Sequence, residues 1–343
     1  MAAPALGRLL DWQRRARAYD ARRQPDSATL CRRRALREAG HLGRTYPLER
    51  SAVLAELGMS HFAALRLDSA GRYLRAAAAT LAAAPGLDLR RNQFVRRADG
   101  QTEVPGRSAA GRYANAGLTY RRRRELTAAL GLYDRALALQ RILSDEPGLR
   151  WTQCLLGEAY ADQGDTTRAL AYYAQAAATA RRLGPTNAAE LAGQLNDVLN
   201  YARPLLVARR RFGQVHEWAR AARAPLRGLV AAKPALSSFP TQWAKLAMHE
   251  ADAFLAENHP DSAAAALAAA DSARAVALGC SPTICLDRRV RLHLLRAHLS
   301  RRQGTPPPRV GISKMPSLTS PPSAPPPTRW PSPALANSWP SNS

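Results

Sequence analysis

Small and aromatic residues recur at fixed intervals between residues 151 and 184, and this spacing constrains the fold more than any other feature. The residues at offsets of 0, 3, 7, 12, 16 and 19 are Gly157, Tyr160, Gly164, Ala169, Tyr173 and Ala176. Small residues that face one another let two helices approach closely, while the tyrosines fill the space beside them. A glycine between the helices permits a tight turn. The segment is therefore predicted to be an antiparallel helix pair.

The same spacing returns in three other segments, which argues against chance in an alanine-rich chain. Residues 109–142 contain Gly117, Tyr120, Ala129, Tyr133 and Ala136, with Arg124 in place of the turn glycine. Residues 51–83 contain Gly58, His61, Ala70, Leu74 and Ala77, and residues 243–277 contain Ala251, Phe254, Ala263, Leu267 and Ala270. Weaker units are predicted at 188–228 and near 6–40. An ordinary bundle of alanine-rich amphipathic helices is the alternative.

This pattern resembles the tetratricopeptide repeat, whose commonest period is 34 residues. Here the packing residues Ala129 and Ala169 are 40 residues apart. The longer spacing resembles that of tetratricopeptide arrays in bacterial (Bacteroidetes-type) sensor histidine kinases and regulators. The resemblance implies an all-α fold, a right-handed superhelical solenoid of antiparallel helix pairs over residues 1–304. Within it, residues 84–108 are expected to be an insertion with one short helix at 88–98, and residues 288–304 a broken unit.

Several second helices are expected to begin with an acidic residue that accepts hydrogen bonds from free backbone N–H groups. The candidate capping residues are Asp26, Asp68, Asp165 and Asp261. Pro25 and Pro260 directly precede two of them and are expected to help end the preceding helix.

The resemblance also implies a function: a concave groove, lined by the first helix of each pair, that binds a segment of another protein. The polar residues expected to line it are Arg112, Asn115, Thr119, Gln153, Glu158, Asn196 and Asn200. The leading interpretation is a protein–protein interaction scaffold, the sensory or docking module of a bacterial two-component signalling protein that has been truncated.

The net charge of +24, carried almost entirely by arginine, raises a second possibility. The densest runs are Arg32–Arg34, Arg121–Arg124 and Arg209–Arg211. They could form a footprint for phosphate groups, so a nucleic-acid-binding helical array is the alternative function. Two of the runs fall where a first helix should end, where arginine complements the helix dipole, and we favour that interpretation.

Signatures of catalysis and of cofactor binding are absent from the sequence, which contains no phosphate-binding loop, no GxSxG and no HExxH. The four cysteines, Cys31, Cys154, Cys280 and Cys285, lack the spacing of a metal site. A small disulfide between Cys280 and Cys285 remains open. The expectation is a protein that is not an enzyme and binds neither metal nor cofactor.

The two ends of the chain bear on its location. No apolar run is long enough to span a membrane, and the N-terminus lacks the apolar core of a signal peptide, so the chain as written is expected in the cytoplasm. A missing start or C-terminal part would instead allow a periplasmic or membrane-attached protein. Residues 305–343 hold 12 of the 25 prolines and no acidic residue. They are interpreted as a disordered tail or as the product of a shifted reading frame near Gly304 and Thr305.

Overall fold

The computed structural model describes residues 2–42, 45–183, 188–232, 238–276, 295 and 297–301. All of them belong to one compact unit, Met1–Pro308, and the second unit, Arg309–Ser343, lies outside the described residues. The predictions for the proline-rich tail, for Cys280 and Cys285, and for most of the unit at 288–304 fall outside the described residues as well.

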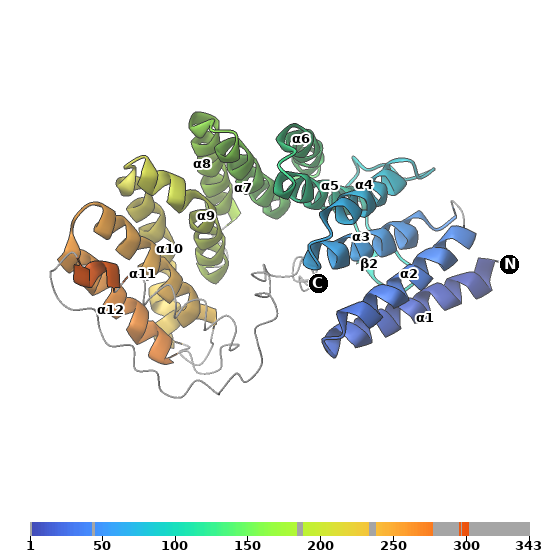
Figure 1. The fold of residues 1–343 in the computed structure, drawn as a ribbon, viewed down its shortest axis with the longest axis horizontal. Helices are drawn as coiled ribbons and strands as arrows, with labels where there is room; N and C mark the ends of the chain where they lie inside the picture. The colour runs from blue at the N-terminus through green and yellow to red at the C-terminus, as the bar shows by residue number, and fades with distance from the viewer. Residues whose placement is uncertain are drawn as a thin grey trace. The chain divides into compact units, whose positions relative to one another are not determined.

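The described chain is built from consecutive pairs of helices (Figure 1). The pairs are α1 (Ala2–Ala21) with α2 (Pro25–His41), α3 (Pro47–Ala63) with α4 (Leu67–Ala82), α5 (Pro105–Arg122) with α6 (Leu126–Ile142), α7 (Glu146–Asp162) with α8 (Thr166–Leu183), α9 (Ala188–Ala208) with α10 (Phe212–Ala232), and α11 (Ser238–Ala256) with α12 (Pro260–Val276). Each helix packs on its partner, and each second helix also packs on the first helix of the next pair. The predicted all-α fold of stacked helix pairs is confirmed.

Each turn within a pair contains one residue in the left-handed backbone region. These residues are Arg23, Leu65, Arg124, Gly164, Arg210 and Asn258. The N–H group of the following residue donates to a carbonyl in the last turn of the first helix, as from Asp165 to Tyr160 at 2.9 Å and from Glu125 to Tyr120 at 3.0 Å. This arrangement satisfies carbonyl groups that a helix end leaves free. A shared turn geometry thus links the pairs, although only one turn uses glycine.

Replacing Arg124 with glycine is expected to stabilise the protein by about 0.5–1 kcal/mol, because φ of 65° is unfavourable for any residue with a Cβ atom. The side chain is 77% exposed, so its loss removes little. The urea midpoint measures the gain. The control is Arg124→Ala, which removes the charge but keeps the Cβ atom; an equal gain from it would contradict the explanation.

The repeated small residues allow close contact between the helices of a pair. A Cβ atom on Gly157 would lie 2.5 Å from Tyr173, and one on Gly117 would lie 2.5 Å from Tyr133. Gly58 is similarly close to Leu74. The alanines of the repeated set are fully buried: Ala70, Ala129, Ala136, Ala169, Ala176, Ala251 and Ala263. Tyr120 is buried, and Tyr160 is half-buried and stacks on Tyr172.

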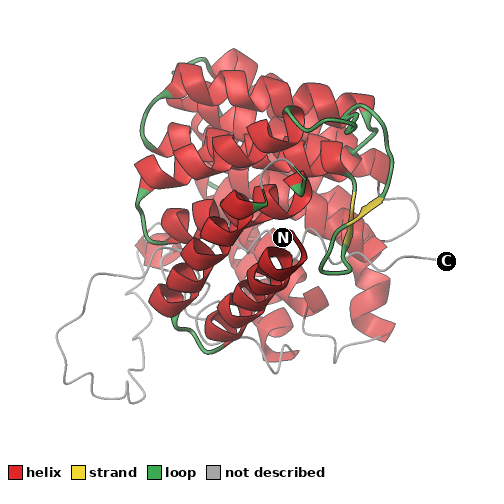
Figure 2. Cartoon of the chain, turned by 90° about the vertical axis from the view of Figure 1, so that its right-hand side faces the viewer, coloured by secondary structure: helices red, strands yellow, loops and turns green. Residues whose placement is uncertain are grey.

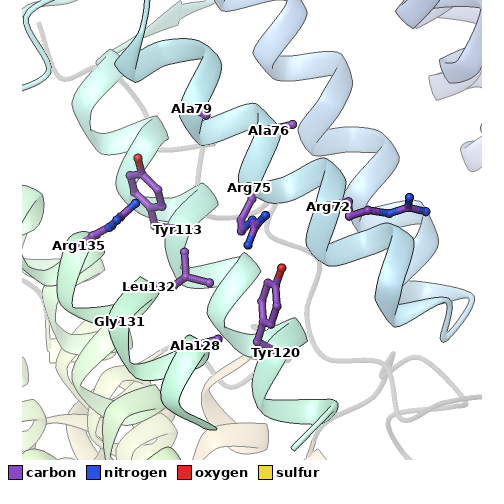
Figure 3. A pocket seen from close by; sticks show the side chains of 10 residues that line it. All are labelled: Arg72, Arg75, Ala76, Ala79, Tyr113, Tyr120, Ala128, Gly131, Leu132 and Arg135. Atoms are coloured by element: carbon purple, nitrogen blue, oxygen red, sulfur yellow. The ribbon is translucent and has the colours of Figure 1, made fainter. Parts of the chain in front are cut away.

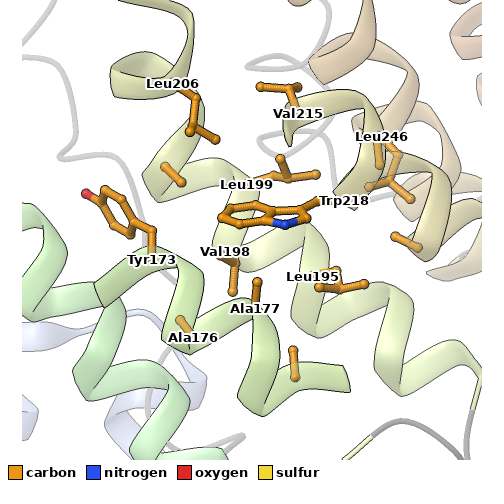
Figure 4. Packing of buried hydrophobic residues seen from close by; sticks show 14 of the residues in the cluster. Tyr173, Ala176, Ala177, Leu195, Val198, Leu199, Leu206, Val215, Trp218 and Leu246 are labelled. Carbon is orange, nitrogen blue, oxygen red and sulfur yellow. The ribbon is translucent and has the colours of Figure 1, made fainter. Parts of the chain in front are cut away.

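The hydrophobic core continues from pair to pair. One buried cluster joins α7 through α11, with Trp218 of α10 packed among Leu195, Val198 and Leu199 (Figure 4). Another joins α4 through α7, and Tyr160 contacts both clusters. Leu295 and Leu299 are buried against α11 and α12. Because every pair covers its neighbour, removing one large core side chain affects more than one pair.

Residues 84–104 form an insertion that differs from its prediction. The expected helix at 88–98 is wrong: strands β1 (Val95–Arg96) and β2 (Thr102–Glu103) pair antiparallel in this segment (Figure 2). The backbone N–H of Ala98 donates to the Glu49 carboxylate at 2.7 Å, and Asp99 pairs with Arg17 at 3.2 Å. These contacts with α1 and α3 hold the insertion in an extended conformation.

The helix starts follow the prediction only in part. Asp165 accepts a hydrogen bond from the Arg168 N–H at 3.0 Å, as expected of a capping residue. Asp26 and Asp68 lie within the first turns of α2 and α4, which begin without a side-chain capping hydrogen bond. Pro25 and Pro260 are themselves the first residues of α2 and α12. Proline suits that position because its missing N–H would have no partner in the helix.

Candidate functional site

The first helices of successive pairs lie side by side. The helix α5 contacts α7, α7 contacts α9, and α9 contacts α11. Arginine–carboxylate pairs cross each of these junctions. Arg121 of α5 pairs with Glu158 and, at 3.1 Å, with Asp162 of α7. Arg150 of α7 pairs with Asp197 of α9 at 3.7 Å, and Arg203 of α9 pairs with Asp252 of α11. We call the side of α7, α9 and α11 that these pairs mark the first-helix face.

Helix α9 shows which side chains this face offers to a ligand. Asp197 reaches back to α7 and Arg203 reaches forward to α11. At 100° per residue, Asn200 points between these two directions and away from the buried residues Leu195, Leu199 and Leu206. Its side chain is exposed. An amide at this place can both donate to and accept from a peptide backbone.

The carboxylates of α7 raise the pKa of Arg121 of α5. Burial alone would lower the pKa of Arg121, but the carboxylates of Glu158 and Asp162 more than offset it and raise that pKa above its ordinary value. The pairs therefore fix the spacing of neighbouring first helices while leaving little unbalanced charge.

The predicted binding residues divide by burial. Asn200 is exposed, and Asn115 and Glu158 are half-buried. The other four are enclosed: Arg112, Thr119, Gln153 and Asn196. The Thr119 hydroxyl donates to the Asn115 carbonyl at 3.0 Å, and Gln153 accepts from the Thr179 hydroxyl at 3.0 Å. In this arrangement these four side chains offer a partner little exposed surface.

Arg112 is enclosed by the insertion. Its guanidinium lies 3.7 Å from the Glu103 carboxylate of β2, and its side chain is 9% exposed. Burial lowers the pKa of Arg112 to about 10, although Glu103 opposes this shift. Since Arg17 and Glu49 also bind the insertion, it lies against the first helices of the first three pairs. The open part of the first-helix face therefore begins beyond it.

Sequence reasoning missed the arginine–carboxylate pairs between first helices. The only signal available was that Arg121, Arg150 and Arg203 and their acidic partners all fall on predicted first helices. Four arginines of the predicted runs are paired with carboxylates. Arg32 pairs with Asp20. Arg121 and Arg124 pair with Asp162, and Arg123 pairs with Asp68 at 2.9 Å.

A metal site or a reactive thiol would be the first sign of chemistry among the described residues. Among them there is no group of His, Cys, Asp and Glu side chains that could hold a metal ion. Cys31 and Cys154 are free and buried, and burial raises the pKa of the Cys154 thiol to about 12. That thiol is therefore a poor nucleophile at neutral pH. In the same part of the chain, no helix has the length and apolar character needed to cross a bilayer.

The sequence model of the tetratricopeptide repeat family matches residues 109–182. Residues 109–182 are tetratricopeptide repeats. They correspond to the two pairs α5–α6 and α7–α8, where Gly117 meets Tyr133 and Gly157 meets Tyr173. The remaining pairs keep the same packing of tetratricopeptide-like units with weaker sequence signals. No curated protein matches the sequence.

Several solved structures are similar to this chain. BtubC (BKLC) from P. vanneervenii is 17% identical, with a TM-score of 0.54, and the match covers 74% of this chain and 92% of that one. Tetratricopeptide-like repeats of a kinesin light chain-type protein from Podosopora anserina are 18% identical over 68% of this chain and 98% of that one, with a TM-score of 0.49. The apo form of RapI is 12% identical over 79% and 84%, with a TM-score of 0.47. At such identities the likeness concerns the fold alone.

Proposed function

We propose that this protein is a non-enzymatic scaffold that binds a polypeptide segment of another protein along the first-helix face. The observation that carries the proposal is the row of adjacent first helices in a tetratricopeptide repeat array. Such a row presents exposed side chains at regular intervals, which suits an extended or helical peptide. Asn200 lies in the middle of this row, between the ion pairs on either side of α9.

The charge of the face favours a peptide over a nucleic acid. Arg121, Arg150 and Arg203 are each paired with a carboxylate. Nucleic acid binding requires arginines that are free to neutralise phosphates. Nucleic acid binding by the other basic residues is the alternative function.

The finer part of the proposal concerns biological context. The long repeat spacing resembles that of bacterial signalling arrays, and we propose a docking role in a two-component sensor or regulator in the cytoplasm. Only the resemblance supports this context, and it stays a prediction.

The binding proposal can be tested with peptides selected from a displayed random library on the intact protein. Asn200→Arg should weaken binding of the selected peptides by about tenfold or more, because a long charged side chain would obstruct the centre of the face. Fluorescence anisotropy measures the affinity. Gln175→Arg is the matched control, since Gln175 is also exposed but lies on the second helix α8.

Two results would contradict the proposal. The first is a selection that yields no peptide binder. The second is a set of peptides whose affinity falls equally for Asn200→Arg and Gln175→Arg, or does not fall for either variant.

A further inference from the structure

A hollow of about 540 Å³ lies where α4, α5 and α6 meet. Two second helices, α4 and α6, supply its sides, and Tyr113 and Tyr120 of α5 also line it (Figure 3). This volume falls in the range of sites that take a few side chains or a small ligand. The first-helix face, built from α7, α9 and α11, shares no residue with it.

The two second helices line the hollow with the same spacing. Residues at offsets of 0, 3, 4 and 7 contribute Arg72, Arg75, Ala76 and Ala79 from α4, and Ala128, Gly131, Leu132 and Arg135 from α6. This spacing places each set on one face of its helix. The small residues leave the space open, and the arginines make it basic.

The arginines of the hollow differ from those of the first-helix face in their partners. No carboxylate in the described part of the chain forms an ion pair with Arg72, Arg75 or Arg135, and no acidic residue lines the hollow. Arg123 lies close by and is paired with Asp68 at 2.9 Å and Glu125 at 2.7 Å. Positive charge in the hollow is therefore not balanced from within the described chain.

The tyrosines position two of these arginines. The Arg75 guanidinium lies 5.6 Å from the centre of the Tyr120 ring, and that of Arg135 lies 5.9 Å from the centre of the Tyr113 ring. Figure 3 shows both pairs bordering the same space, with Leu132 between them. A guanidinium that stacks through its face keeps its N–H edge free for a carboxylate.

We propose that this hollow binds an acidic segment of another protein, with Arg75 and Arg135 holding its carboxylates and Leu132 contacting the apolar part of the segment. Paired N–H donors match a carboxylate in geometry as well as in charge. A nucleic acid duplex needs a long basic track, whereas here the exposed carboxylates of Asp68 and Glu125 lie next to the hollow on Arg123. This binding is independent of the first-helix face.

A short polyglutamate peptide with a fluorescent label is the probe, and the full chain is the protein. The double variant Arg75→Gln/Arg135→Gln should bind the probe at least about tenfold more weakly than the native chain. The matched control is Arg124→Gln/Arg209→Gln, which removes the same charge from exposed positions outside the hollow. Equal losses from both would mean that net charge alone attracts the probe, and would overturn the proposal.

A second variant blocks the hollow without changing its charge. A Cβ atom on Gly131 meets no atom within 4 Å, so Gly131→Leu leaves the packing intact while its side chain occupies the space. It should also weaken binding of the polyglutamate probe by about tenfold, and undiminished binding would contradict the proposal.

A polyglutamine peptide, which carries no carboxylates, should not bind. If duplex DNA instead binds more tightly than polyglutamate and depends on the same residues, the occupant is a nucleic acid and the proposal fails. Asn200→Arg should leave polyglutamate binding unchanged.

Discussion

Replacing Tyr173 with alanine is expected to lower the free energy of unfolding by about 3–5 kcal/mol. Tyr173 is 2% exposed and packs on Gly157 of the facing helix, in a cluster that also includes Trp218 and Leu199. The substitution leaves a cavity at the contact between α7 and α8 and beneath α9. Urea denaturation followed by circular dichroism measures the loss.

The contact between Gly157 and Tyr173 can be tested by compensation. Gly157→Leu alone should destabilise the protein by about 1–3 kcal/mol, because even a Cβ atom would collide with the Tyr173 ring. When Gly157→Leu is combined with Tyr173→Ala, the leucine can fill the vacated space. The double variant should therefore lose less stability than the sum of the losses of the two single variants. Additive losses would show that the two residues do not share one packing site. Gly213→Leu is a control, since a Cβ atom there meets nothing within 4 Å.

The fold could be predicted because its strongest constraint is local and repetitive. The need for a small residue opposite a tyrosine shows in the sequence at Gly117 and Tyr133, and again at Gly157 and Tyr173. The turns were harder to predict, because Arg124 and Arg210 adopt a left-handed conformation that usually indicates glycine or asparagine. There the packing of the two helices overrides the preference of the residue.

The insertion and the binding residues could be predicted only in part, because both depend on contacts between distant segments. Residues 95–103 are extended since Glu49 and Arg17 hold them, and no local pattern reveals those partners. Polar residues on first helices look alike in sequence, yet Asn200 is exposed and Asn196 is buried. Which of them can face a ligand depends on how closely the next helix packs.

Replacing Glu103 with alanine is expected to lower the free energy of unfolding by about 3–5 kcal/mol, because it leaves a buried arginine without its carboxylate. Arg112 is 8% exposed, and Glu103 is the acidic residue that pairs with it among the described residues. Glu103 also accepts a hydrogen bond from the Ser108 hydroxyl at 2.8 Å, so the substitution removes a second contact between the insertion and α5. Urea denaturation measures the cost, and limited proteolysis should show faster cleavage within residues 84–104.

A paired substitution separates the buried charge from the rest of the contact. Changing both partners, as Glu103→Leu with Arg112→Met, removes the charge and keeps most of the volume, so it should recover much of the lost stability. Glu125→Ala is the control, because Glu125 pairs with Arg123 at 2.7 Å on a more exposed surface and should cost less than about 1 kcal/mol. If Glu103→Ala costs no more than this control, Arg112 does not depend on Glu103. The insertion would then be held against the first helices mainly by Glu49 and Asp99, since these are its other polar contacts with α1 and α3.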